Sequence, residues 1–316
     1  MQSQKPGKVC DGLWYLGLPE TGVYLLESQE EYMIISGGMS YIVPTVMQQL
    51  KEFGLREDRI KKALILHAHF DHIGVVPYLR RIRPDIKVYA SERAFEILAN
   101  PRAIDTINDF SRDVAARMGM NDVCDTYELD WAPGLEGEKV REGDTIKVGA
   151  MDVQIFETPG HSSCSISAYA RDLRALFPSD GGGVPYKGKI APAANSNYTL
   201  YKESLRKLRA LDVEYMCADH FGYLYGDEGR DYIARSLEAA EQECAMYEEV
   251  YRRTRDVESA AREVATNWLT ENPDYFLTSD IYLGICRQTM KHIARNVEGS
   301  TKATTDTHNS NNRRRV

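Results

Sequence analysis

Short apolar runs alternate with stretches of helical spacing along the first 228 residues of the chain. Helical spacing of apolar residues predicts helices over residues 42–53, 75–83, 92–98 and 198–211. Runs rich in β-branched and aromatic residues predict strands over residues 23–26, 32–35, 63–66, 87–90, 145–148, 153–156, 165–169, 175–177 and 215–217. This alternation is typical of a mixed α/β domain.

Beyond residue 228 the pattern changes to long helical stretches with few breakers. Apolar residues at helical spacing predict helices over residues 230–255, 257–270 and 279–296. The polar tract that follows has almost no apolar residues and ends in three arginines and a valine. We therefore expect an α/β domain at residues 1–228, a C-terminal helical region at 229–298 and a disordered tail at 299–316.

Five of the seven histidines fall in three clusters, and each cluster follows a predicted strand. Imidazole suits zinc, iron and similar cations, while a carboxylate can bridge two ions about 3.5–4 Å apart. Solvated loop histidines are the plainer interpretation, but four ligand-type residues within six positions favour a metal centre. The candidate ligands are His67, His69, Asp71, His72, His161, Asp180 and His220.

The run from His67 to His72 matches the H-x-H-x-D-H signature of the metallo-β-lactamase-fold hydrolases, and the chain resembles the glyoxalase II-like branch of that superfamily. The resemblance implies a four-layer αββα sandwich with an appended C-terminal helical region. It assigns one ion to His67, His69 and His161 and the second ion to Asp71, His72 and His220. Asp180 matches the bridging carboxylate.

The resemblance also implies a dinuclear metal-dependent hydrolase of thioesters or of related acyl esters and lactones. Two divalent ions lower the pKa of a bound water toward neutrality, so that hydroxide can attack at physiological pH. Asp71 is the expected catalytic carboxylate, since it could accept a proton from that water. We expect zinc, with iron and manganese as alternatives.

Two departures from the family pattern concern the surroundings of the ligands. The family often has an aspartate before the paired glycines near the N-terminus, where this chain has Ser36. The last histidine usually follows Pro-Gly, whereas His220 follows Asp219. Asp219 could orient an imidazole or be a solvated turn residue.

The run at residues 275–284 looks like the corresponding segment of a quinolone-pathway thioesterase of this superfamily, whose helices cap its active site. The helical region would then be a cap that restricts the substrate. Through this resemblance Tyr282, Leu283 and Cys286 are candidate substrate contacts. Tyr223, which is near a ligand in sequence, is a fourth candidate.

Residues 100–131 form an insertion with helical spacing over 104–118 and several large apolar residues. The insertion could form a lid, fold onto the core, or make a subunit contact that would give a homodimer. The pattern does not separate these alternatives.

Composition supports a soluble cytoplasmic enzyme, and the resemblance implies that its partner is a small-molecule acyl substrate. The net charge of −8 argues against nucleic acid as a partner. No apolar run approaches the ~20 residues that span a bilayer, so no membrane partner is expected. The N-terminus lacks the apolar stretch of a secretory signal, and the six dispersed cysteines read as reduced thiols.

Two other functions compete with acyl hydrolysis. Some members of the superfamily hydrolyse phosphodiesters or other phosphoryl groups, although this chain has no obvious basic groove. A non-catalytic protein that keeps the metal site and acts through a partner is the other alternative. A flavin-coupled reductase is disfavoured, because that branch normally has Glu where this chain has His69.

Overall fold

Two seven-stranded sheets form the centre of the structure, which is a computed structural model. The structure describes the backbone of residues 1–275 and 277–312, and the side chains of these residues up to residue 299. The first sheet has the order β1 (Gln2–Ser3), β16 (Tyr223–Tyr225), β15 (Tyr215–Cys217), β12 (Ala175–Phe177), β11 (Ile166–Ala170), β10 (Met151–Glu157), β9 (Thr145–Val148). The second has the order β2 (Gly7–Cys10), β3 (Leu13–Leu18), β4 (Thr21–Ser28), β5 (Glu31–Ile35), β6 (Ile60–Leu64), β7 (Lys87–Ser91), β8 (Glu138–Val140). A hairpin, β13 (Val184–Tyr186) and β14 (Lys189–Ala191), lies outside both sheets.

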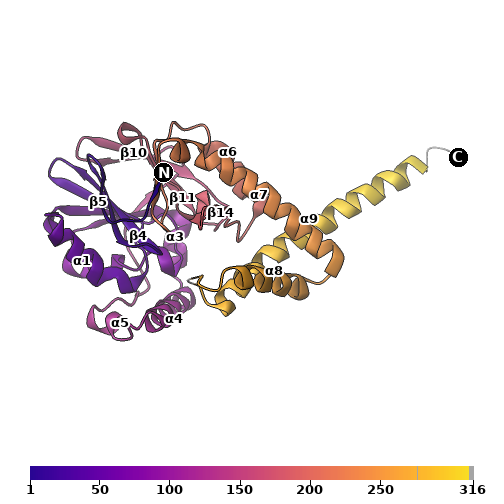
Figure 1. The fold of residues 1–316 in the computed structure, drawn as a ribbon, viewed down its shortest axis with the longest axis horizontal. Coiled ribbons are helices and arrows are strands. Elements are labelled where there is room, and N and C mark those ends of the chain that lie inside the picture. Colours follow the sequence, from indigo (N-terminus) through magenta and orange to yellow (C-terminus); the bar gives the residue numbers. More distant parts are fainter. Residues whose placement is uncertain (276, 313–316) are drawn as a thin grey trace.

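Helices cover the outer face of each sheet, which gives the four-layer αββα sandwich (Figure 1). The second sheet packs against α1 (Val43–Glu52), α2 (Val76–Ile82), α3 (Glu92–Leu98), α4 (Pro101–Arg117) and α5 (Val123–Thr126). The first sheet packs against α6 (Tyr198–Leu208) and α7 (Asp227–Thr254). The expected fold class is confirmed.

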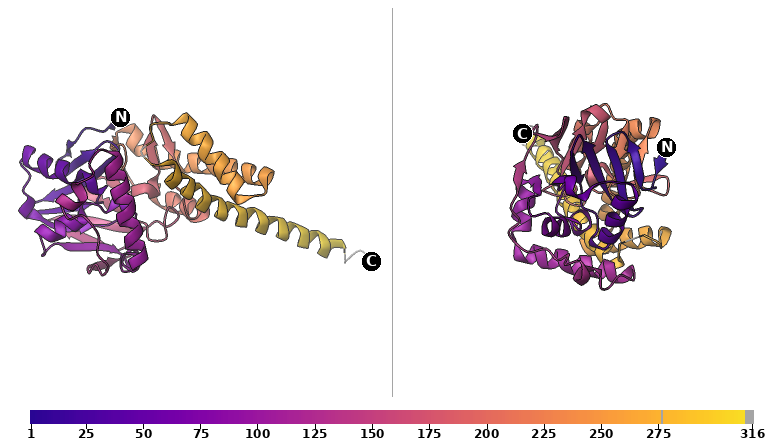
Figure 2. Two further views of the ribbon diagram at one scale, coloured as in Figure 1. Left: turned by 90° about the horizontal axis from the view of Figure 1, so that it is seen from below. Right: turned by 90° about the vertical axis from the view of Figure 1, so that its left-hand side faces the viewer.

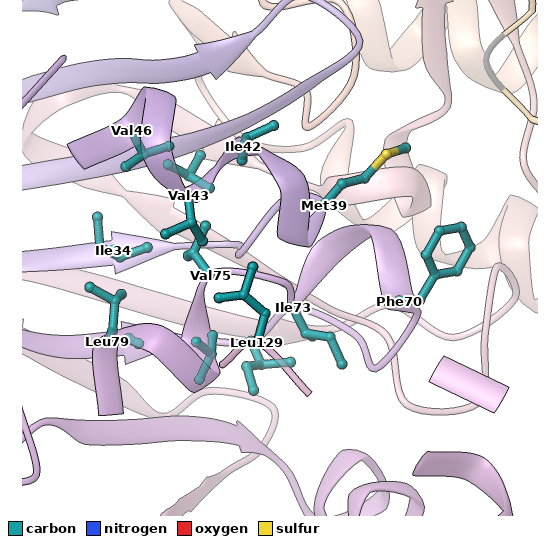
Figure 3. Close-up of a cluster of buried hydrophobic side chains, with 14 of the residues drawn as sticks. Ile34, Met39, Ile42, Val43, Val46, Phe70, Ile73, Val75, Leu79 and Leu129 are labelled. Carbon is teal, nitrogen blue, oxygen red and sulfur yellow. The ribbon is translucent and has the colours of Figure 1, made fainter. Parts of the chain in front are cut away.

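Alternation along the strands explains the layering. In β4, Tyr24 and Leu26 point into the core between the sheets, whereas Val23 and Leu25 point to the helices. Successive side chains of a strand face opposite sides, so a strand that is apolar throughout is buried on both faces. Figure 3 shows part of the helix-side core, in which Ile34 of β5 lies among side chains of α1 and α2.

The C-terminal region consists of α7, α8 (Val257–Glu271) and α9 (Ser279–Asn312), which pack on one another and on α6. The far part of α9 extends away from the sandwich (Figures 1 and 2). The sequence predicts a disordered tail from residue 299, whereas the α9 backbone continues to Asn312; residues 313–316 lie outside the described part. An established helix adds one hydrogen bond per residue, so it can extend into a polar tract that lacks proline. The boundaries at 228 and 298 stay predictions.

The insertion at residues 100–131 folds onto the core, with Ile104, Ile107 and Val114 of α4 buried against the second sheet's helices. Met118, at the end of α4, remains exposed. The insertion thus belongs to the sandwich's helical layer. Whether it also forms a subunit contact stays a prediction.

Candidate metal centre

All the predicted ligands follow the ends of strands at one edge of the sandwich. In the first sheet β10, β12 and β15 run in the same direction, because β11 is antiparallel to both β10 and β12 while β12 is parallel to β15. His161, Asp180 and His220 therefore emerge at the same edge. His67 to His72 follow β6, the strand that is parallel to its neighbours β5 and β7 in the second sheet.

The side chains meet in three overlapping groups whose nitrogen and oxygen atoms lie within 4.8 Å of one another. The first group is His67, His69 and His161, and the second is Asp71, His72 and His220. The third joins His67 and His72 to Asp180, so that Asp180 lies between the other two groups. The first two groups are the sets that the family resemblance implies for two ions, and the atoms of each group are close enough together to hold a metal ion.

Hydrogen bonds orient the histidine rings. The Nδ1–H of His161 donates to the Ala193 carbonyl at 2.7 Å, and that of His220 donates to the Glu20 carbonyl at 2.7 Å. Their Nε2 atoms then face the cluster, where His161 Nε2 lies 3.0 Å from His69 Nδ1 and His220 Nε2 lies 3.3 Å from His72 Nε2. Ring nitrogens this close suit a shared cation.

A buried carboxylate, Asp219, orients two further histidines. Asp219 Oδ2 accepts hydrogen bonds from His72 Nδ1–H at 2.7 Å, from Ser36 Oγ–H at 2.9 Å and from the Ser179 hydroxyl. Because the Ser179 hydroxyl has one proton, its oxygen then accepts from His67 Nδ1–H at 3.2 Å. Both histidines are left with Nε2 facing the cluster.

This network also accounts for the two departures from the family pattern. Ser36 replaces the usual aspartate at the end of β5, and Asp219 supplies a carboxylate from the other sheet to which Ser36 donates. Asp219 is 2% exposed, so it is not a solvated turn residue. Of the two roles that the sequence left open for Asp219, the structure supports the orientation of an imidazole ring.

The protonation states and hydrogen bonds of the clustered histidines and aspartates suit the binding of cations. His67 Nε2 is buried without a hydrogen-bond partner among the described residues, which is costly unless a ligand occupies it. Burial opposes protonation of His72, but Asp71 and Asp180 outweigh that effect and raise its pKa well above the usual value. Burial, together with the nearby His161, lowers the pKa of His69 to about 4. The site therefore combines a neutral imidazole at His69 with carboxylates that attract positive charge around His72.

Apolar neighbours fix the turn that carries Asp71 and His72. Phe70 and Ile73 flank these ligands and belong to the helix-side core cluster, part of which Figure 3 shows; Phe70 also lines the cavity. A Cβ atom on Gly37 would lie 2.7 Å from Ile73 Cα, so the loop after β5 can approach the turn closely only with glycine there. Backbone hydrogen bonds from Gly74 and Val75 to this loop complete the support.

A cavity of about 1100 Å³ opens from the ligand cluster toward the C-terminal helices. Its walls come from α4, from the segment that follows β14, and from α6, α7, α8 and α9. Ile107, Phe110, Trp268, Tyr275 and Tyr282 make much of this wall apolar or aromatic. No lysine or arginine lines the cavity within the described residues.

The structure places the four predicted substrate contacts differently from one another. Tyr282 lines the cavity, whereas Leu283 and Cys286 lie in the packing between helices behind it. Cys286 is fully buried, with its Sγ 3.6 Å from the Tyr247 hydroxyl. Tyr223 lies away from the cavity, because β16 directs it toward Tyr15 at the core between the sheets.

Glu243 is a cavity residue that the sequence did not predict. It lies on α7 and accepts a hydrogen bond from the Tyr198 hydroxyl. Burial raises the pKa of the Glu243 carboxyl to about 7. The sequence feature that could have identified Glu243 is its position on the apolar face of α7, the same face as Ala240 and Tyr247.

An αββα sandwich with histidines and aspartates gathered at one edge defines a class of metal-binding hydrolase folds. The chain belongs to the metallo-beta-lactamase superfamily, a superfamily of metal-dependent hydrolases, whose family model matches residues 20–220. Among the described residues, no helix has the length and apolar character needed to cross a bilayer.

Relatives of known name include two acyl hydrolases. Hydroxyacylglutathione hydrolase from Rhodopseudomonas palustris (strain HaA2) is 40% identical over 82 residues, which cover 24% of this chain and only 29% of that protein. The acyl-coenzyme A thioesterase MBLAC2 from Gallus gallus is 25% identical over 219 residues, covering 65% of this chain and 74% of that protein.

A solved structure extends the likeness of the fold to most of the chain. A metallo-beta-lactamase family protein from Thermus thermophilus superposes with a TM-score of 0.65 at 18% identity. The match covers 92% of this chain and 95% of that one. It therefore includes part of the C-terminal helical region.

Proposed function

We propose that the protein is a dinuclear zinc-dependent hydrolase of small acyl thioesters. The observation that carries this proposal is a two-group ligand cluster at one end of a large cavity with aromatic walls. The two named relatives act on an acylglutathione and an acyl-coenzyme A, both of which are thioesters. The cavity has no lysine or arginine within the described residues, which disfavours a phosphodiester substrate.

His67, His69 and His161 would hold one ion, and Asp71, His72 and His220 would hold the other, with Asp180 between them. Bound divalent ions supply a Lewis acid for the acyl carbonyl and lower the pKa of water. Asp219 keeps His72 in the tautomer that presents Nε2. Asp71 faces the cluster with Oδ2 3.5 Å from His72 Nε2, so its carboxylate is placed to hold a proton during hydrolysis.

The cavity walls would bind the acyl group. Tyr275 and Leu277 precede α9 and meet Phe110 of α4 across the same cavity. Side chains from distant parts of the chain thus enclose the space beside the ligands. Such a wall excludes water and favours acyl groups of matching shape.

The test combines metal analysis with a substrate panel. Protein purified without added metal should contain, or take up on reconstitution, two ions per chain, and should hydrolyse thioesters faster than lactones or phosphodiesters. His69→Ala and Asp180→Ala should lower metal content and abolish hydrolysis together. His292→Ala, which removes a histidine of α9 that pairs with Asn296, is the matched control and should retain both.

Well under one ion per reconstituted chain would refute the metal assignment. Near-normal hydrolysis by Asp180→Ala would remove that carboxylate from the reaction. A loaded protein that cleaves phosphodiesters but no thioester would refute the proposed substrate class.

A further inference from the structure

We propose that Glu243 forms a subsite that recognises a positively charged amino group on the acyl portion of the substrate. This inference rests on the proposed acyl hydrolysis and names the class of acyl group. Glu243 and the ligands Asp180 and His161 line the same cavity. A substrate with its carbonyl at the ligand cluster would therefore extend its acyl group toward the part of the cavity that Glu243 lines.

Among the described residues, Glu243 is a carboxylate without a cationic partner. Its one hydrogen bond there comes from the Tyr198 hydroxyl, and no described lysine, arginine or histidine forms an ion pair with it. A carboxylate has about four acceptor positions. Its remaining capacity faces the cavity, where the side chain keeps part of its surface accessible although it lies deep inside the protein.

The surrounding side chains suit a cation rather than an anion. Tyr198, Tyr247 and Tyr282 line the cavity, and burial together with the charge of Glu243 raises the pKa of each hydroxyl. These phenols stay neutral, and their ring faces attract cations. Trp268, stacked on Tyr282 with ring centroids 6.0 Å apart, extends this aromatic wall.

The charged residues that line the rest of the cavity also favour a cationic ligand. Asp113 and Asp280 also line it, and no lysine or arginine does so within the described residues. A ligand that carries a negative group beside Glu243 would meet that buried carboxylate with no lysine or arginine of the cavity wall to compensate it within the described residues, which is unfavourable. An ammonium group would instead form an ion pair with Glu243 and contact the aromatic rings.

The experiment compares two thioesters of N-acetylcysteamine that differ in charge and are similar in shape. 4-(Aminomethyl)benzoyl thioester carries an ammonium group where 4-ethylbenzoyl thioester has a methyl group. The wild-type protein should prefer the charged substrate by about tenfold or more in kcat/KM, the size expected for a hydrogen bond between charged groups. Glu243→Gln should remove most of this preference.

Glu241→Gln is the matched control. Glu241 lies on the same helix, half exposed, and pairs with Arg206 at 3.0 Å on the outer surface. This variant should keep the wild-type preference. Calorimetric binding of the two product acids, 4-(aminomethyl)benzoate and 4-ethylbenzoate, gives a readout that does not depend on turnover.

The outcomes separate the two proposals. If the wild-type protein hydrolyses both thioesters equally well, or prefers the ethyl compound, the subsite is refuted while thioester hydrolysis stands. The wild-type protein could instead cleave neither thioester and yet bind 4-(aminomethyl)benzoate more tightly than 4-ethylbenzoate. If Glu243→Gln abolishes that difference in binding, the subsite stands and the proposed hydrolysis fails. A wild-type preference for the ammonium compound that Glu243→Gln leaves unchanged would assign the preference to another carboxylate of the cavity, such as Asp113 or Asp280, and would refute the subsite.

Discussion

Replacing Glu243 with Gln should stabilise the protein above neutral pH and change its stability little near pH 4.5. Burial raises the pKa of Glu243 from 4.5 to about 7. At about 1.4 kcal/mol per pKa unit, this gap corresponds to about 3 kcal/mol. Glutamine never ionises, and its amide oxygen can still accept the hydrogen bond from Tyr198.

The sign follows from proton binding. Between pH 4.5 and about 7 the folded protein retains the proton on Glu243 while the unfolded chain releases it. The stability that wild-type protein derives from this carboxyl therefore falls as pH rises through this window and is constant above it. The difference between Glu243→Gln and wild type should be close to zero at the acidic end and reach about 3 kcal/mol at the alkaline end.

Urea denaturation of both proteins at several pH values measures this difference, because titrations elsewhere in the chain cancel between them. Glu241→Gln, at the outer surface of the same helix, should show no such pH-dependent gain. A difference that is constant with pH, or a variant that is less stable than wild type above neutral pH, would refute the reasoning.

Two further predictions concern the ligand support and the C-terminal helices. Asp219→Asn should weaken metal binding about 10- to 100-fold in a chelator competition, because it removes the charge that orients His72. Ser36→Ala, which loses one hydroxyl donor to Asp219, should weaken metal binding less. An unchanged metal affinity in Asp219→Asn would contradict the role assigned to Asp219. Ending the chain after residue 228 should destabilise the protein or widen its substrate range, because α6 and the first sheet would lose the helices that cover them. Removing only residues 300–316 should have neither effect. A stable truncated protein with unchanged selectivity would move the specificity to α4.

Much of the ligand set could be predicted because its signal is local. His67, His69, Asp71 and His72 lie within six positions, so their spacing alone constrains which side chains can meet. The apolar strands before each ligand cluster are also short-range patterns. The family resemblance assigned His161, Asp180 and His220 to the same centre, and the structure brings them to one edge because β10, β12 and β15 run in the same direction.

Short or atypical strands were missed for the same local reason. The sequence shows no clear alternation over β2 or β14, and each is a strand because a neighbour supplies hydrogen bonds. Tyr223 illustrates the limit for a side chain. Its closeness to His220 in sequence suggested the cavity, but the pairing of β16 with β15 turns it toward Tyr15 instead.

By itself, then, the sequence determined the mixed α/β class, because periodicity acts over a few residues. Its local motif carried the family resemblance that implied the four-layer sandwich and the metal-binding residues. Only the tertiary structure decided the role of Asp219, which receives hydrogen bonds from Ser36 and His72, residues more than a hundred positions away. It also decided that Glu243 lines the cavity, because the packing of α7 against α6 and α9 leaves one carboxylate facing an interior space. Contacts between distant segments depend on how whole layers pack, and no local pattern encodes that geometry.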